Sequence, residues 1–106
     1  MSNWLANYVT GNEELLRKYF DKEEYKDNAK FVVKEDKSIE LQLTGPSFFL
    51  DEIEKMIEEN PEEDILWNYH YTDLYAYDGE HYFERKEGIN KEWVDTSTIT
   101  EDDLED

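Results

Sequence analysis

The sequence has no cysteine, and its 106 residues include only two prolines, four glycines and 11 basic residues. The lack of cysteine excludes disulfides, a thiolate nucleophile and cysteine-ligated metals, and it is typical of a reducing compartment. No apolar run approaches the roughly 20 residues of a membrane-spanning helix, and residues 1–4 do not have the pattern of a signal peptide. We therefore expect a cytoplasmic protein.

The scarcity of basic residues leaves a net charge of −18, because 29 residues are acidic. A chain of this charge repels polyanions, which excludes direct binding to nucleic acid and to anionic membranes. Residues 1–37 hold eight acids and seven bases, so almost the whole excess lies in residues 38–106. This uneven distribution indicates an acidic face.

Two segments have apolar residues at helical spacing. Asn12 is a good N-cap, and the spacing after it predicts a helix over about residues 12–26. The second predicted helix carries Phe49, Ile53, Met56 and Ile57 as one apolar stripe and ends before Pro61. Both patterns place one face of the helix against a core.

The remaining apolar segments alternate with a period of two, which predicts strands. The segments are 3–10 (with a short helix as the alternative), 31–33 and 39–44 in a hairpin, 65–72, and 80–84 in a second hairpin with 75–77 around Asp78-Gly79. The order predicts an α+β ferredoxin-like sandwich, β-α-β-β-α-β plus an extra hairpin strand, with two helices on one face of an antiparallel sheet. The predicted core is Leu15, Leu16, Phe20, Phe31, Ile39, Leu41, Ile53, Ile57 and Trp67.

The chain is long enough for one domain only. We expect this domain to cover residues 1–90, followed by an acidic tail over 91–106, because periodicity is poor from residue 87 onward.

Two stretches of the sequence resemble the YubB-type ferredoxin-like domains of bacterial plasmids and phages. The first is Met1-Ser2-Asn3-Trp4-Leu5-Ala6-Asn7-Tyr8-Val9-Thr10-Gly11, and the second runs from Leu41 through Pro46 and Pro61 to Glu84. Leu5 stands where members of that family usually have cysteine, no tryptophan precedes the second helix, and the family's Gly-Thr-Lys-Trp region is absent. The resemblance implies the ferredoxin-like fold, a mobile-element origin and a bacterial host cell, and it supplies no catalytic residue.

The residues that could carry catalysis or bind a metal lack the expected spacing. His70 and His81 could pair with Asp73, Asp78 or Glu80, but the absence of a His-x-x-x-His motif favours two ordinary strand residues. There is no glycine-rich phosphate loop and no triad motif, so we predict no enzyme activity, no cofactor and no metal. A set of aromatic residues could stack on bases, but the charge excludes this: Trp67, Tyr69, Tyr71, Tyr75, Tyr77 and Tyr82. Alternation predicts that Trp67, Tyr69 and Tyr71 face the core.

The second predicted helix and the turn after it carry eight acids and one base between Asp51 and Asp64. Glu58 and Glu59 oppose the helix dipole, and Glu54 and Glu58 form a like-charge i,i+4 pair. Because these acids break local rules that the first helix follows, we interpret them as functional. The predicted partner-binding residues are these acids and nearby tyrosines: Glu54, Glu58, Glu59, Glu62, Glu63, Asp64, Tyr75, Tyr77 and Asp78.

These observations lead to one hypothesis and one alternative. The hypothesis is an interaction protein of a phage or plasmid whose acidic face mimics nucleic acid and occupies a basic surface of a host protein, such as a CRISPR or restriction complex. The alternative is an accessory or regulatory ferredoxin-like domain that is acidic only for solubility.

Overall fold

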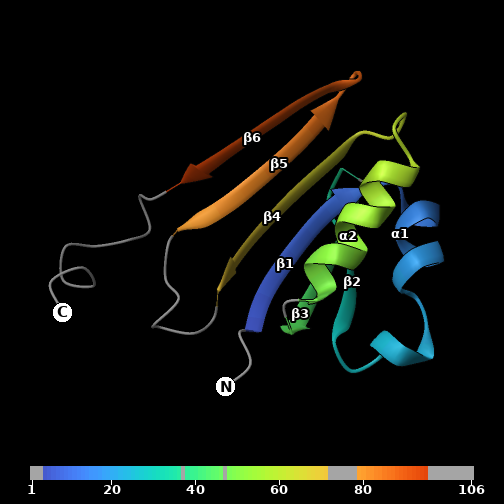
Figure 1. The fold of residues 1–106 in the computed structure, drawn as a ribbon. Coiled ribbons are helices and arrows are strands. Elements are labelled where there is room, and N and C mark those ends of the chain that lie inside the picture. Colours follow the sequence, from blue (N-terminus) through green and yellow to red (C-terminus); the bar gives the residue numbers. More distant parts are fainter. Residues whose placement is uncertain (1–3, 37, 47, 72–78, 96–106) are drawn as a thin grey trace, which may run out of the picture.

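In a computed structural model, the chain forms an antiparallel sheet with two α-helices on one face (Figure 1). The structure describes residues 4–36, 38–46, 48–71 and 79–95. The elements are β1 (Trp4–Gly11), α1 (Glu13–Phe20), the 3-10 turn η1 (Glu23–Tyr25), β2 (Ala29–Val33), β3 (Ile39–Pro46), α2 (Phe48–Glu59), β4 (Ile65–Tyr71), β5 (Glu80–Lys86) and β6 (Ile89–Asp95). The strand order is β2-β3-β1-β4-β5-β6, and each neighbouring pair is antiparallel. The predicted α+β class is confirmed.

The first helix begins as predicted and ends earlier than predicted. Asn12 caps it, because its side-chain Oδ1 accepts a hydrogen bond from the Leu15 backbone N–H at 3.2 Å. The helix ends at Phe20, and η1 then places Tyr25 edge-on to the ring of Phe20, with 5.2 Å between centroids. Burial of Tyr25 between Phe20 and Phe49 therefore replaces the last turns of the expected helix.

The core lies between the helices and the sheet. Its buried members are Val9, Leu15, Leu16, Phe20, Tyr25, Ile39, Leu41, Leu43, Phe49, Ile53, Met56, Ile57, Ile65 and Trp67. Eight of the nine predicted core residues are among them. Phe31 differs, since it is only partly buried and packs against this cluster beneath the Arg17 guanidinium, 4.7 Å from its ring centroid.

The hairpin at the C-terminal side differs from the prediction. β5 pairs with β6 around Glu87 and Gly88, which both have positive φ (53° and 80°), as the favoured two-residue hairpin turns require. The chain is thus regular up to Asp95, past the predicted domain boundary at residue 90. The predicted hairpin strand 75–77, Asp78 and tail residues 96–106 lie outside the described residues.

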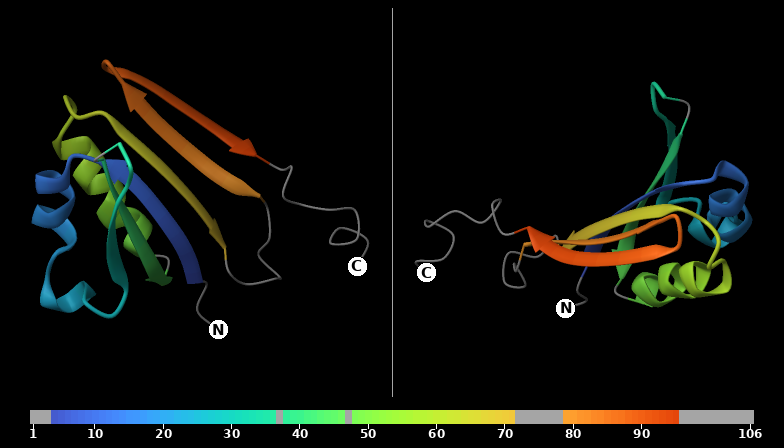
Figure 2. Two further views of the ribbon diagram at one scale, coloured as in Figure 1. Left: turned by 180° about the vertical axis from the view of Figure 1, so that it is seen from behind. Right: turned by 90° about the horizontal axis from the view of Figure 1, so that it is seen from above.

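The helical layer does not extend over the whole sheet. In Figures 1 and 2, β5 and β6 lie beyond the helices. Burial decreases in the same direction: Trp67 of β4 is 4% exposed, most of β5 is half-buried, and almost all of β6 is exposed. An uncovered part of the sheet therefore borders α2.

Candidate functional site

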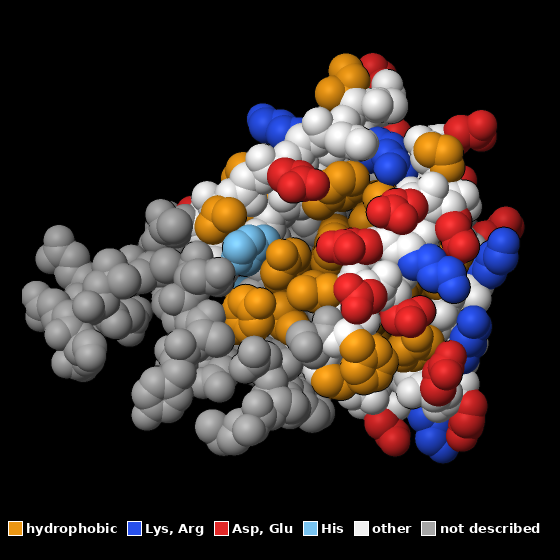
Figure 3. Space-filling model, in the orientation of Figure 1, with side chains coloured by type: hydrophobic (Ala, Val, Ile, Leu, Met, Phe, Trp, Pro, Cys, Tyr) orange, Lys and Arg blue, Asp and Glu red, His pale blue; other side chains and the backbone are white. Residues whose placement is uncertain are grey.

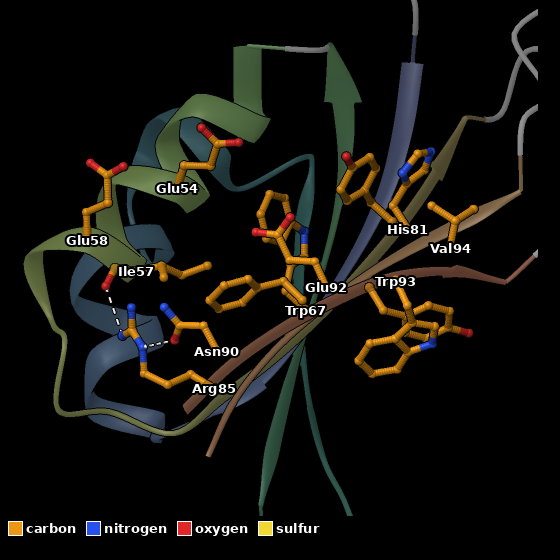
Figure 4. Close-up of a pocket in the computed structure, with 13 residues that line it drawn as sticks. Glu54, Ile57, Glu58, Trp67, His81, Arg85, Asn90, Glu92, Trp93 and Val94 are labelled. Atoms are coloured by element: carbon orange, nitrogen blue, oxygen red, sulfur yellow. Dashed lines mark hydrogen bonds between the residues drawn. The ribbon is translucent and has the colours of Figure 1, made fainter. Parts of the chain in front are cut away.

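A groove of about 580 Å³ lies where α2 meets the uncovered part of the sheet (Figure 4). Ile57 of α2, Trp67 of β4 and Phe83 of β5 line it with apolar surface. Trp67 and Phe83 are opposite each other in the β4–β5 register, so their side chains share the helix-facing side of the sheet. These residues form a largely apolar floor against one wall of the helix.

Aromatic rings continue this floor toward its far end. Tyr69 lies 5.0 Å from Trp67 between ring centroids, and His81 stacks on Tyr69 at 4.8 Å with an interplanar angle of 6°. The prediction that Trp67, Tyr69 and Tyr71 face the core is confirmed for the first two, since Trp67 is buried and Tyr69 packs against the core. Tyr71 is half-buried and is not among the residues packed against the core. Trp67 and Tyr69 also line the groove.

Three carboxylates stand along the groove. Glu54 and Glu58 project from α2, and Glu92 projects from β6 (Figure 4). Desolvation raises the pKa of the Glu54 carboxyl, and the nearby charges of Asp51, Glu58 and Glu92 raise it further. The contribution of these neighbouring acids shows that negative charge is concentrated at this rim, so a cation entering the groove would be attracted to it. Acidic side chains also surround exposed apolar surface in the space-filling view (Figure 3).

Arg85 is the one lysine or arginine among the described residues that line the groove, and it is buried. Its role there is structural. Its side chain is 7% exposed, and its Nη1 donates hydrogen bonds to the carbonyl oxygens of Ile57 at 3.0 Å and Asn60 at 2.8 Å. Its Nε donates to Asn90 Oδ1 at 2.9 Å. Arg85 thus binds carbonyls at the C-terminal end of α2, and it makes no ion pair with the three rim carboxylates.

This position of Arg85 corrects one step of the sequence argument. Glu58 and Glu59 were expected to oppose the helix dipole without compensation. The compensating cation comes from β5, so the end of α2 is stabilised by a tertiary contact that helix sequence cannot show. The acids at this end are therefore compatible with a stable helix.

In the structure, the predicted partner-binding residues lie in separate places. Glu54 and Glu58 line the groove. Glu59 points toward α1, where its Oε1 accepts a hydrogen bond from the Tyr19 hydroxyl at 2.6 Å, which raises the pKa of Tyr19. Tyr75, Tyr77 and Asp78 lie outside the described residues.

The other predicted acids lie beyond the end of α2. Glu62, Glu63 and Asp64 border a shallow depression together with the turn at Gly11 and the end of β5. Asp64 Oδ1 accepts a hydrogen bond from the Glu87 backbone N–H at 3.0 Å, which fixes this loop to the β5–β6 turn. The acids of the second helix and its following turn therefore form two groups rather than one continuous surface.

Sequence reasoning missed Phe83 and Glu92 as groove residues. The signal that could have found them is the strand pairing that follows once Glu87-Gly88 is taken as the two-residue turn of a hairpin. Phe83 and Glu92 are then opposite each other and on the same side of the sheet as Trp67.

The two histidines are on opposite faces of the sheet. His70 stacks against Tyr8 with 6.1 Å between centroids, whereas His81 stacks on Tyr69 on the helix-facing side. Such an arrangement cannot bring the two imidazoles to one metal ion. Within the described ranges, no three or more potential metal-ligating side chains lie together, and no helix there has the length and apolar character needed to cross a membrane.

Comparison of the chain with protein-family models, curated proteins and solved structures gave no match. The resemblance to YubB-type domains therefore stays a prediction from residues.

Proposed function

We propose that this chain is a non-enzymatic binding protein of a phage or plasmid, and that its acidic surface occupies a basic nucleic-acid-binding surface of a host protein. A CRISPR or restriction complex is the kind of partner that such a surface would inhibit. The proposed fold is a ferredoxin-like sandwich with β5 and β6 as added strands, which is supported by the order β2-β3-β1-β4 and by the helices after β1 and β3.

The observation that carries this proposal is the distribution of ion pairs along the chain. All four ion pairs among the described residues lie between residues 13 and 40, for example Arg17 with Glu13 at 2.8 Å and Lys34 with Glu40 at 3.2 Å. The eight acids from Asp51 to Asp64 make none of these pairs. Their charge is therefore not neutralised by ion pairs within the described fold and is available to a basic partner.

A basic nucleic-acid channel fits this charge pattern because it is built to release counterions from a polyanion. Groups of carboxylates can replace phosphates there, and the association would be fast and strongly salt-dependent. The alternative is a ferredoxin-like accessory domain that is acidic only for solubility. Arg85 supports the alternative, since it stabilises the end of α2 and so removes one reason to treat the acids there as functional.

Charge reversal on the two sides of the molecule separates these functions. One variant carries Glu58→Lys, Glu62→Lys and Glu63→Lys. The matched control carries Glu14→Lys, Glu24→Lys and Glu35→Lys, which are exposed, make no ion pair within the described residues and change net charge equally. Immobilised wild-type protein is incubated with nuclease-treated bacterial lysate, and bound proteins are eluted with salt or duplex DNA and identified by mass spectrometry.

The proposal predicts capture of a nucleic-acid-binding protein that DNA displaces, with loss in the first variant and retention in the control. Equal loss in both variants would show that only net charge matters. Bound proteins that DNA does not displace would also contradict nucleic-acid mimicry.

A further inference from the structure

The sheet is wide enough to accommodate a further helix beside α2. Strands are about 4.8 Å apart and packed helices about 10 Å apart, so two helices cover about four strands. The sheet has six strands, and β5 and β6 lie beyond the helical layer (Figure 2). The uncovered width, about 10 Å, corresponds to one more helix.

The helix-facing side of these strands has the residues that a packed helix needs. Phe83 is half-buried and Val94 is 47% exposed, and both line the groove beside the buried ring of Trp67. Side chains of this kind complement the apolar stripe of an amphipathic helix. Burial of Phe83 and Val94 would remove apolar surface from water that this chain leaves exposed.

The charges around this surface favour a bound helix that is positively charged. Glu54 lies on α2 and Glu92 lies on β6, and both carboxylates line the groove next to its apolar floor (Figure 4). The raised pKa of Glu54 agrees with this charge pattern, because after partial desolvation the neighbouring acids Asp51, Glu58 and Glu92 are its causes. A helix with lysine or arginine flanking its apolar stripe would meet both carboxylates.

We propose that the groove between α2 and β4–β6 binds a basic amphipathic helix of the partner protein, packed beside α2 as a third helix on the sheet. This inference rests on the proposed function, and it names the segment of the partner that is bound. The apolar side chains of that helix contact Phe83 and Val94, and its basic side chains approach Glu54 and Glu92.

Charge disfavours other occupants. A second copy of this chain carries −18 and would bring further acids to an acidic rim. Residues 96–106 of the same chain contain five acids and no base, so they too have the wrong sign. Nucleic acid is repelled for the same reason.

A synthetic peptide tests the inference directly. The peptide has about 18 residues, with leucine at i, i+3, i+4 and i+7 spacing and lysine elsewhere, which is long enough to form a helix on binding. Two control peptides are used: one has glutamate in place of lysine, and the other has the same composition without the helical spacing. Binding is measured by calorimetry, and the site is mapped by amide chemical-shift changes in the intact chain.

Two isosteric variants provide the comparison. Glu54→Gln with Glu92→Gln removes the rim charges, and Glu14→Gln with Glu24→Gln removes the same charge from a distant part of the surface. All four glutamates are exposed, so both variants are expected to fold. We expect the rim variant to bind the basic helix about fivefold more weakly and the control to bind as the wild type does. Val94→Ser is expected to weaken binding through lost apolar contact, with little effect on salt dependence.

Several outcomes would overturn the inference. Equal binding of the peptide without helical spacing would exclude helix docking, and shifts confined to the outer edge of β6 would indicate strand addition instead. If the peptide bound only after residues 96–106 were removed, the chain's own tail would be the occupant.

The two proposals can fail separately. Loss of helix binding, with DNA-displaceable capture still dependent on Glu62 and Glu63, removes this inference and leaves the proposed function. Helix binding without such capture removes nucleic-acid mimicry as the function.

Discussion

Replacing Arg85 tests the energetic role of the one cation buried in the groove. Arg85→Met keeps much of the apolar length of the side chain and removes its donors to the Ile57 and Asn60 carbonyls. Hydrogen bonds from a charged donor contribute about 1.5–3 kcal/mol each, and leaving their buried partners unpaired costs a similar amount, so two of them predict a loss of about 3–6 kcal/mol. The total free energy of unfolding of a small domain is only about 5–15 kcal/mol.

A loss of this size is measurable by thermal and urea denaturation. At about 4–8 °C per kcal/mol, Tm should fall by at least about 12 °C. Lys86→Met is the control, because it removes the same charge from the next residue of β5, where the side chain is exposed. If Arg85→Met unfolded within about 1 kcal/mol of the wild type, water would satisfy the α2 carbonyls and the reasoning about Arg85 would be wrong.

Two further variants test the α2 region. Glu54→Gln should raise the urea midpoint at about pH 7 and have no effect at about pH 3. The reason is that the pKa of the Glu54 carboxyl is raised in the folded state. The stability of the wild type therefore falls as pH rises from the ordinary carboxyl pKa through the raised value. An equal gain at both pH values would contradict this. Gly45→Ala should lower stability by about 1–3 kcal/mol, because a Cβ there would overlap ring carbons of Phe49, and a Phe49→Leu background should reduce that loss. An unchanged Tm would mean that the ring moves aside at no cost.

The sequence was sufficient to predict the segments with strong apolar periodicity. The two helices, the 39–44 strand and eight of nine core residues are as expected, because burial on one face requires a period that the residues display. The end of α1 was less predictable. Helical spacing continues past Phe20, and the earlier end depends on the packing of Tyr25 against Phe49, a contact between segments distant in sequence.

β6 was not predicted because its residues do not alternate. Asn90, Glu92 and Val94 lie on one side of the strand, while Ile89 and Trp93 lie on the other, so neither side is consistently apolar. An exposed edge strand is held mainly by backbone hydrogen bonds to its neighbour, and these leave little trace in side-chain patterning. The turn at Gly88 was the available signal, and Asp78-Gly79 is the stronger sequence match to the same turn type.

The candidate site was predicted only in part for a related reason. Glu54 and Glu58 were identified from charge within one helix, whereas Glu92 joins them through strand pairing across a turn that was assigned elsewhere. Arg85 and Lys86 stand together in an acidic region of the sequence, and only the position of Arg85 beneath the end of α2 shows what it binds. Local rules of helix charge therefore give an incomplete account wherever another element supplies the compensating group.

Asn7 provides a last test, because it connects three strands through a buried side chain. It is 1% exposed, its Nδ2 donates to the Leu43 carbonyl at 3.1 Å, and its Oδ1 accepts from Trp67 Nε1 at 3.0 Å. Asn7→Leu should lower stability by about 1–3 kcal/mol, mainly by leaving the indole N–H of Trp67 buried without an acceptor.

The cost of Asn7→Leu should shrink by about 1 kcal/mol or more in a Trp67→Phe background, since that background has no N–H to satisfy. Urea denaturation of the four proteins in this double-mutant cycle gives the coupling, and additive losses would contradict a specific Asn7–Trp67 hydrogen bond. Because Trp67 forms the floor of the groove, Asn7→Leu should also weaken binding of the basic helical peptide, although Asn7 itself does not line the groove. A folded Asn7→Leu protein that bound the peptide as the wild type does would show that the groove floor keeps its shape without this polar anchor.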